Sequence, residues 1–168
     1  RMLHQGEGAL SVVDVTLDGR TLLLSRYVSV NEQRLFTMPA DGGALTEIAK
    51  GPRARLANAR FIRGGQAVAA ITNRGSDVGR LVEIDPATGA TRPIAPEGKW
   101  DVEGFDVDDA GRVIAWSTNE DGYSVVSVQD LVTRRALPQP QLPRGVAGGL
   151  RLSRDGSKLA VSVASPAG

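Results

Sequence analysis

Short apolar runs alternate with polar turns along the whole chain, and the runs recur at a fixed spacing. Four turns, each followed by an apolar run, carry Gly19, Gly65, Gly111 and Gly156, which lie 46, 46 and 45 residues apart. A fixed period of about 20–50 residues is the mark of a repeat architecture. The pattern therefore predicts a series of similar structural units.

Each unit is predicted to contain four short strands. The first two flank the glycine turn, and the last two flank a second turn that contains Asp or Gly residues. Residues 81–85 alternate apolar and polar side chains, as a half-buried strand does, and the runs after the glycine turns are apolar on both faces. No segment shows a convincing helical period with caps. The expected strands are about 11–17, 20–25, 34–39 and 45–49, then 57–62, 66–72, 80–85 and 91–95, then 104–108, 112–117, 123–129 and 133–137, and finally 149–153 and 157–163.

Four strands in about 45 residues is typical of a β-propeller blade. The predicted fold class is all-β, a partial propeller of about three and a half four-stranded blades spanning residues 1–168. The expected units are about 8–56, 57–103, 104–148 and, incomplete, 149–168. A β-sandwich also has short strands, but it does not need turns that recur at this spacing. Since an open arc would expose strand edges, the chain is expected to be a fragment, or to complete a ring with a second copy or another piece of its parent.

Composition narrows the possible functions. The chain has 20 basic and 19 acidic side chains, one histidine and no cysteine. A net charge of +1 gives no overall attraction to nucleic acid or to an anionic membrane, and no apolar run approaches the ~18 residues of a membrane span. Without cysteine there is no disulfide or thiolate, and one histidine leaves little room for metal or triad chemistry. We expect no nucleic-acid or membrane partner, no cofactor, no metal and no catalytic residue in this chain.

Several segments resemble one group of propellers. Residues 153–161 resemble a Ser-Pro-Asp-Gly-Lys-x-Leu-Ala turn, and residues 84–91 an Asp-x-x-Thr-Gly turn, of Tol-type and prolyl-oligopeptidase-type propellers. Three longer segments, 72–77, 100–105 and 119–124, resemble the non-catalytic propeller of bacterial prolyl oligopeptidase family serine peptidases, which include acylaminoacyl- and dipeptidyl-peptidase-like enzymes. The resemblance covers about residues 8–165.

That resemblance implies a propeller that caps a catalytic α/β-hydrolase domain and admits short peptides to its serine. The Gly-x-Ser-x-Gly elbow of such a domain is absent here, because the nearest match, residues 122–126, lacks the last glycine. The first hypothesis is therefore a non-catalytic segment of a serine peptidase that gates substrate access and docks the hydrolase domain of the parent chain. Its partners would be that domain and a peptide substrate. The alternative is a Tol-like propeller that serves as a protein–protein binding module. Bacterial cytoplasm and periplasm both stay open as locations.

Loops between the second and third strands, and connectors between units, emerge on one face of a propeller. Here they are longer and more polar than the glycine turns, and functional residues usually lie on such loops. The alternative for each residue is that it closes a turn or braces a neighbouring blade. The candidates facing a substrate or a docked domain are Arg26, Tyr27, Asn73, Arg74, Asp77, Trp100, Glu103, Asn119, Glu120 and Tyr123.

Three further groups of residues are interpreted as structural. The carboxylates of residues 106–111 could surround a cation, but their spacing does not match a calcium loop, and a hairpin turn is the preferred interpretation. Trp116 is expected in the core, whereas Trp100 either lines a mouth or braces a blade. An arginine cluster is interpreted as a solvated connector; its members are Arg53, Arg55, Arg60 and Arg63.

Overall fold

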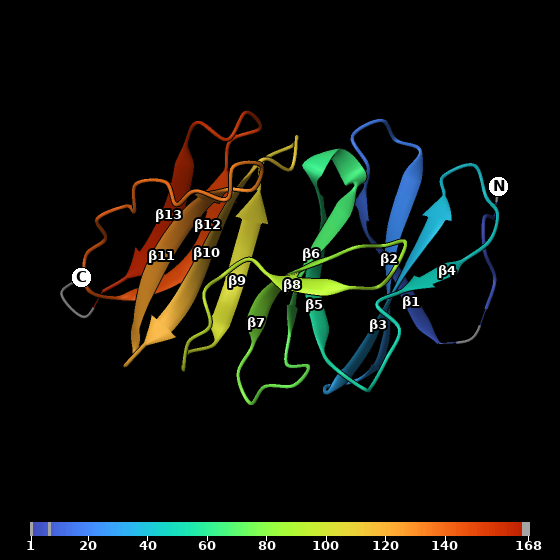
Figure 1. Cartoon of the computed structure of the whole chain (residues 1–168). Coiled ribbons are helices and arrows are strands. Elements are labelled where there is room, and N and C mark those ends of the chain that lie inside the picture. The colour runs from blue at the N-terminus through green and yellow to red at the C-terminus, as the bar shows by residue number, and fades with distance from the viewer. Residues whose placement is uncertain (1, 7, 166–168) are drawn as a thin grey trace. The chain divides into compact units, whose positions relative to one another are not determined.

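The computed structural model describes residues 2–6 and 8–165 (Figure 1). Those residues form thirteen strands in four sheets, and every strand pair is antiparallel. The chain divides into two compact units, residues 1–97 and 98–168, which are described separately. In the part of the chain that the structure describes, no helix is long or apolar enough to cross a membrane. The all-β prediction is confirmed.

The N-terminal unit contains two four-stranded sheets in which strands adjacent in sequence are adjacent in space. Their orders are β1-β2-β3-β4 and β5-β6-β7-β8. This simple meander is the arrangement of a propeller blade. The strands are β1 (Ala9–Val15), β2 (Thr21–Ser29), β3 (Glu32–Pro39), β4 (Thr46–Ile48), β5 (Leu56–Ile62), β6 (Ala67–Thr72), β7 (Arg80–Ile84) and β8 (Thr91–Pro93).

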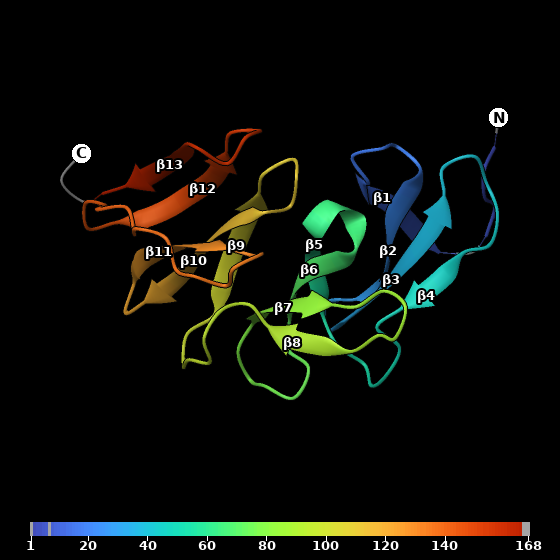
Figure 2. The same ribbon diagram turned by 45° about the horizontal axis from the view of Figure 1, so that its top comes forward.

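The C-terminal unit contains a three-stranded and a two-stranded sheet (Figure 2). The first has the order β11-β10-β9, and the second pairs β12 with β13. Each follows the same meander as the larger sheets. The strands are β9 (Val102–Val107), β10 (Val113–Glu120), β11 (Tyr123–Asp130), β12 (Val146–Leu152) and β13 (Leu159–Ala164).

The predicted strand at residues 133–137 is wrong. Only one bridge forms there, between Gln129 and Ala136. The carboxylate of Asp130 accepts the N–H groups of the residues two and three places on, at 2.8 and 2.7 Å, and Arg134 adopts a positive φ of 57°. Pro138 then offers no backbone N–H. A tight turn and a missing donor therefore reduce the fourth strand of this sheet to a single bridge.

The glycine turn has the same hydrogen bonds in three of the four sheets. The residue three places before the repeat glycine donates its N–H to the carbonyl five residues on, at 2.9, 3.1 and 2.9 Å. The glycine N–H donates back to that residue's carbonyl, and the three glycines have φ of 71°, 63° and 70°, which explains why glycine stands there. In the second sheet a 3-10 helix, Arg63–Gly65, replaces this turn. The residues that open the three turns are Thr16, Asp108 and Ser153.

The main core of the N-terminal unit lies between its two sheets. Leu23 of β2 and Val68 of β6 are completely buried there, together with apolar residues of β3, β5 and β7. The neighbouring Leu24 points to the opposite face of the first sheet and is buried against Phe36 and Met38. Burial on both faces confirms the expectation for β2 and β6, whereas the residues of β13, after the last glycine turn, are exposed or only partly buried. Removal of this apolar surface from water is the main stabilising contribution.

Candidate functional site

A carboxylate on the first strand of one sheet holds the first strand of the next sheet. In the N-terminal unit, Asp14 of β1 accepts the backbone N–H of Phe61 at 2.7 Å and the Nε–H of Arg60 at 3.2 Å. Both donors lie on β5. One carboxylate oxygen of Asp14 accepts both a backbone and a side-chain hydrogen bond. It therefore holds β5 beside β1, and its negative charge is paired with the guanidinium of Arg60. We call this arrangement the inter-sheet clasp.

The C-terminal unit repeats the inter-sheet clasp. Asp106 of β9 accepts the backbone N–H of Leu152 at 2.8 Å and pairs with Nη1 of Arg151 at 3.2 Å, and both donors lie on β12. The side chain of Asp106 is only 6% exposed, whereas that of Asp14 is 17% exposed. The same residue types thus make the same contact at two places in the chain.

The inter-sheet clasp follows the sequence repeat. Asp14, Arg60, Asp106 and Arg151 are spaced 46, 46 and 45 residues apart, like the repeat glycines. This alternation of Asp and Arg was not among the predicted features, although it has the same spacing as the repeat glycines. Arg60 therefore does not belong to a solvated connector.

Arg63 is also paired rather than part of a solvated connector. Its Nη1 lies 3.1 Å from Oε1 of Glu83, and Nη2 of Arg92 lies 2.6 Å from the same oxygen. Glu83 is a β7 residue that is only 5% exposed, although alternation suggested a polar face. The hydrogen bond to Glu83 raises the pKa of Arg92. A buried carboxylate without such partners would be costly, so these arginines make its burial tolerable.

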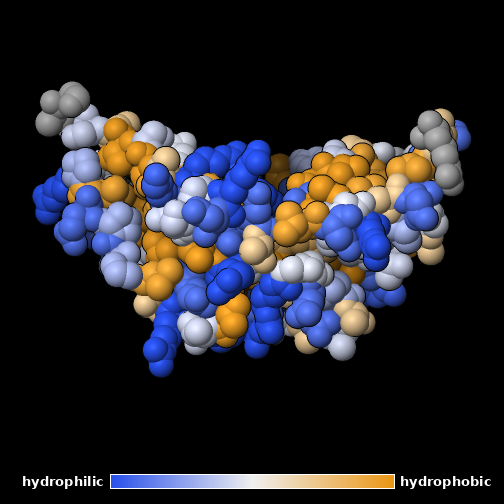
Figure 3. All heavy atoms as spheres, turned by 90° about the horizontal axis from the view of Figure 1, so that it is seen from above, coloured by the Kyte–Doolittle hydropathy of each residue, from blue (hydrophilic) through white to orange (hydrophobic). Residues whose placement is uncertain are grey.

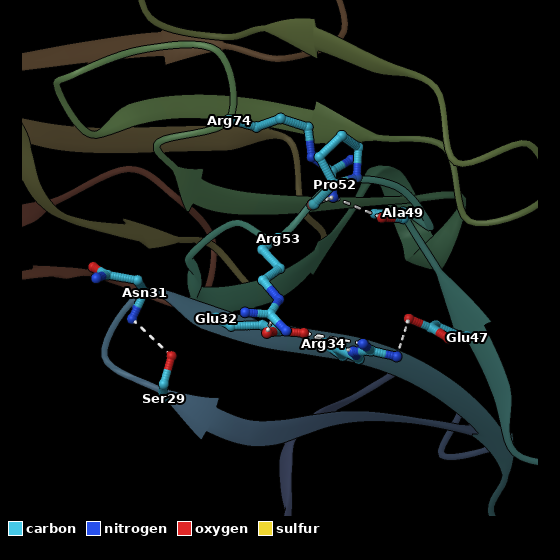
Figure 4. A network of polar contacts seen from close by, with 9 residues as sticks. All are labelled: Ser29, Asn31, Glu32, Arg34, Glu47, Ala49, Pro52, Arg53 and Arg74. Carbon is cyan, nitrogen blue, oxygen red and sulfur yellow. Dashed lines mark hydrogen bonds and ion pairs between the residues drawn. The ribbon is translucent and has the colours of Figure 1, made fainter.

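A second buried carboxylate, Glu32 at the start of β3, organises a network of charged side chains (Figure 4). Its Oε1 accepts hydrogen bonds from Nε and Nη2 of Arg34 at 3.1 and 3.0 Å, and its Oε2 lies 3.3 Å from Nε of Arg53. Arg34 also approaches Glu47 of β4 at 3.9 Å. Neither Glu32 nor Glu47 was among the predicted site residues, and no local motif identifies them.

Asn73 and Arg74 brace the connector between the two sheets of this unit. Arg74 donates from Nη2 to the carbonyls of Ala49 and Pro52 at 2.9 and 3.4 Å, and Asn73 accepts the N–H of Arg55 at 2.9 Å. The structure therefore brings the loop after β6 against the connector. A small open pocket lies here; its polar side chains come from Glu32, Gln33, Arg34, Glu47, Arg53 and Arg74.

The remaining candidates of the N-terminal unit differ in exposure. Arg26 lies over the ring of Phe36, 4.8 Å from its centroid, and is partly buried. Tyr27 is 51% exposed at the β2–β3 hairpin, where Val28 and Val30 are also exposed. Asp77 is exposed in the β6–β7 loop. Further apolar side chains are exposed on β1, and Figure 3 shows hydrophobic surface on this unit beside polar side chains.

Four candidates of the C-terminal unit lie at the β10–β11 hairpin or next to it. Glu103 accepts hydrogen bonds from Nδ2 of Asn119 at 3.1 Å and from the hydroxyl of Ser124 at 3.4 Å. Glu120 accepts the hydroxyl of Thr118 at 3.3 Å. The exposed ring of Tyr123 lies under the guanidinium of Arg144 at 5.2 Å. The result is an exposed polar surface with two acidic side chains, Glu103 and Glu120, and one aromatic side chain, Tyr123.

The two tryptophans differ as expected. Trp116 is buried in β10, which confirms its assignment to the core. Trp100 is partly buried and carries the ammonium of Lys99 at 4.5 Å from its ring.

The carboxylates of the turns hold backbone rather than a ligand. Asp108 accepts the N–H groups of Arg112 and Val113 at 2.6 and 2.7 Å, as the hairpin interpretation of residues 106–111 requires. Asp155 accepts the hydroxyl of Ser153 at 2.6 Å, and this bond, with those from Ser157, lowers the pKa of Asp155 to about 2. Among the described residues, no three His, Cys, Asp or Glu side chains gather as a metal site would need.

Comparisons with known proteins relate this fold to two kinds of propeller. A prolyl endopeptidase, whose study concerns inter-domain dynamics in catalysis and specificity, matches 87% of this chain with a TM-score of 0.71 at 22% identity. A puromycin hydrolase matches 91% with a TM-score of 0.71 at 20% identity. TolB from Acinetobacter baumannii matches 96% with a TM-score of 0.61 at 17% identity.

These matches cover only part of the longer chains: 21% of the prolyl endopeptidase, 25% of the puromycin hydrolase and 42% of TolB. No family model and no curated protein matches the sequence. At this level of identity the likeness shows the fold. The chain therefore has the fold of a β-propeller segment like those of prolyl peptidases and TolB-like proteins, as the repeat and the resemblance predicted.

Proposed function

We propose that this chain is a non-catalytic propeller segment of a prolyl oligopeptidase family serine peptidase, where it gates substrate access and docks a catalytic α/β-hydrolase domain. The observation that carries the proposal is the match of 87% and 91% of this chain to two peptide- or amide-cleaving enzymes that are much longer. The catalytic serine would lie in a domain outside this sequence, which contains no Gly-x-Ser-x-Gly elbow.

The candidate residues divide into two roles within this proposal. Asn73 and Arg74 hydrogen-bond the connector of the N-terminal unit and keep it in place. Tyr27, Glu103 and Tyr123 are exposed and offer aromatic or acidic contacts to a substrate or to the hydrolase domain. Candidate contacts also include Arg26, Asp77, Trp100, Asn119 and Glu120. No side chain of this chain takes part in bond cleavage.

Labelling with a serine-directed fluorophosphonate probe tests the proposal. In the full-length product of the parent gene, the probe is expected to label one serine outside these 168 residues and to block peptide hydrolysis. The chain alone should neither react nor hydrolyse. Hydrolysis by the isolated chain that the probe abolishes, or a full-length product without a reactive serine, would overturn the proposal.

A kinetic comparison tests the gating role. In the full-length protein, Tyr123→Ala and Glu103→Gln are expected to change the ratio of kcat/KM for long and short peptides while leaving probe labelling intact. Val132→Ala is a matched control, because Val132 is exposed at the opposite turn of β11. An unchanged ratio in both variants would contradict gating by this surface.

A Tol-like binding module is the second candidate. It is favoured by the larger share of TolB that the chain covers, 42%, compared with 21% of the prolyl endopeptidase. In that case the parent protein would lack a reactive serine and would act by binding another protein. The same labelling experiment separates the two functions.

A further inference from the structure

The small open pocket of the N-terminal unit is formed entirely by the interior of the chain. Its lining residues all lie between positions 32 and 74, on β3, β4, β5, the connector between the two sheets and the loop after β6. Both sheets that supply these residues have all four strands. The pocket is therefore a feature of two complete sheets.

A buried charge lies in this pocket beside the apolar core. Ile48 and Leu56, which belong to the core, line the pocket together with Glu32, which is only 7% exposed. At the same distance from the repeat glycine, the second and third units have Val78 and Ser124 in place of Glu32. The repeat therefore does not require a carboxylate here, although burying one is costly unless it is paired.

The connector holds Arg53 in place from both sides. The carbonyl of Pro52 accepts a hydrogen bond from Nη2 of Arg74 at 3.4 Å, and the carbonyl of Ala54 accepts the N–H of Gln33 at 3.1 Å. The backbone on each side of Arg53 is thus tied to a neighbouring strand or loop. Arg53 is therefore positioned before any ligand arrives, which lowers the entropic cost of binding.

Glu32 orients the guanidinium of Arg53 and leaves part of it free (Figure 4). Oε2 of Glu32 lies 3.3 Å from Nε of Arg53, while the other oxygen accepts hydrogen bonds from Arg34. Among the described residues, the two Nη groups of Arg53 have no partner, and this side chain is 87% exposed. Three arginines and two glutamates line the pocket, so one positive charge is left unbalanced.

We propose that this pocket binds one singly charged carboxylate group of a peptide, at its C-terminus or on an Asp or Glu side chain. The planar guanidinium of Arg53 offers paired N–H donors that match the two oxygens of a carboxylate. A doubly charged anion would exceed the unbalanced charge and would lie near Glu32 and Glu47. That the carboxylate belongs to a peptide rests on the proposed function, but the site takes no part in bond cleavage. Serine labelling tests the cleavage and peptide binding tests the pocket, so either can fail alone.

Peptide titration followed by NMR of the arginine Nε–H groups tests the site. The probes are acetyl-Ala-Ala-Ala with a free C-terminus, the same peptide as its C-terminal amide, and acetyl-Ala-Glu-Ala amide, all at one ionic strength. At least one of the two acidic peptides is expected to shift the Arg53 and Arg34 signals to saturation, and the tighter of the two identifies the source of the carboxylate. No saturable shift with either, or an equal shift with the uncharged amide, would overturn the proposal.

An exposed arginine outside the pocket provides a matched control. Arg53→Gln is expected to weaken binding of the acidic peptide by about tenfold or more, followed through the Arg34 signal, because a charge-assisted hydrogen bond is lost. Glu32 keeps its two hydrogen bonds from Arg34 in this variant, so the fold should persist. Arg20→Gln removes the same charge from a side chain that is 86% exposed and pairs with Asp18, and it should not change binding. Equal weakening by both variants would reduce the effect to net charge and overturn the site, as would tighter binding of sulfate than of the acidic peptides.

The full-length product of the parent gene, treated with the serine probe, distinguishes a peptide from a carboxylate of the protein itself. The acidic peptide is expected to bind it about as tightly as it binds the isolated chain. Binding by the isolated chain alone would show that another part of the parent protein occupies the pocket, and would overturn the peptide as its ligand.

Discussion

The two units contain the same inter-sheet clasp but differ in how well the second strand of their last sheet is covered, since β6 is buried along its length and β13 is not. Asp14 and Asp106 each accept a backbone N–H and pair with an arginine of the next sheet. Leu23 of β2 and Ala115 of β10 are completely buried, whereas Ala160, at the same repeat position of β13, is exposed. The contact between first strands therefore depends on the repeat alone, while burial of the second strand also requires a third strand in its sheet.

The charged side chains show the same contrast. Glu32 and Glu83 of the N-terminal unit are buried, and each pairs with two arginines. Glu103 of the C-terminal unit is exposed and accepts hydrogen bonds from neutral groups. Buried pairs stabilise a scaffold, but an exposed carboxylate keeps the capacity to meet a partner.

Shortening a leucine in each unit is expected to give the largest difference. Leu23→Ala removes a completely buried side chain and should lower the free energy of unfolding by about 2–5 kcal/mol. Leu159→Ala removes a partly exposed one and should cost about 1 kcal/mol or less. Urea denaturation monitored by tryptophan fluorescence measures both. Equal losses would show that burial in the two units does not differ as described.

Removing the carboxylate of the inter-sheet clasp should have the next largest effect. Asp106→Ala leaves the N–H of Leu152 without its acceptor and should lower the free energy of unfolding by about 1–3 kcal/mol. Asp14→Ala should cost less, because Asp14 is more exposed. The corresponding Asn variants keep an acceptor oxygen and serve as controls. If Asn and Ala variants are equally unstable, the hydrogen bond is not what holds the two strands.

The arginines of the clasp should matter less than its carboxylates. Arg60→Ala is expected to cost more than Arg151→Ala, since the two side chains are 37% and 76% exposed, and both losses should stay below about 1 kcal/mol. Thermal unfolding at low and high salt measures them, with a smaller difference expected at high salt. A larger loss from Arg151→Ala would contradict the ranking by exposure.

The turn carboxylates should give the smallest effect, a loss of stability in acid. Hydrogen bonds in the fold lower the pKa of Asp155 from 3.8 to about 2. A lowered pKa stabilises the fold above the unfolded value and loses that contribution as the pH falls from about 4 to about 2. Asp155→Asn should flatten this part of the stability profile, measured by urea denaturation at each pH. An unchanged slope in that variant would exclude Asp155 as a source of the dependence.

The repeat made most of the fold predictable. Glycines at positive φ and apolar runs on both faces are local signals, and they placed the four first hairpins. The strand at 133–137 failed because its ending depends on the carboxylate of Asp130 and on the prolines that follow. Turn residues can join two strands or end a ladder, and the strand pattern alone does not distinguish these outcomes.

The candidate site was predictable only in part. The loop after β6 carries Asn73 and Arg74 to the connector, whereas Glu103 and Asn119 meet because they lie on the paired strands β9 and β10. Burial of Glu32 was not predictable, because one of its partners, Arg53, comes from a connector about 20 residues away, and Arg34, two residues on in the same strand, gives no signal of burial by itself. The alternation of Asp and Arg could have been found by aligning the units at every position instead of at their turns.

Amide hydrogen exchange of the unmodified chain tests the central contrast most directly. The contrast is that β2 and β10 pair with a third strand, while β13 pairs with β12 alone among the described residues. The N–H groups of Leu24 and Trp116 bond to the third strands of their sheets, whereas Val161, at the same repeat position, has no strand on that side among the residues that the structure describes. We predict slow exchange for Leu24 and Trp116, and exchange on the order of a hundredfold faster for Val161. Equally slow exchange of all three amides would contradict the account, because it would mean that the open edge of β13 is already paired.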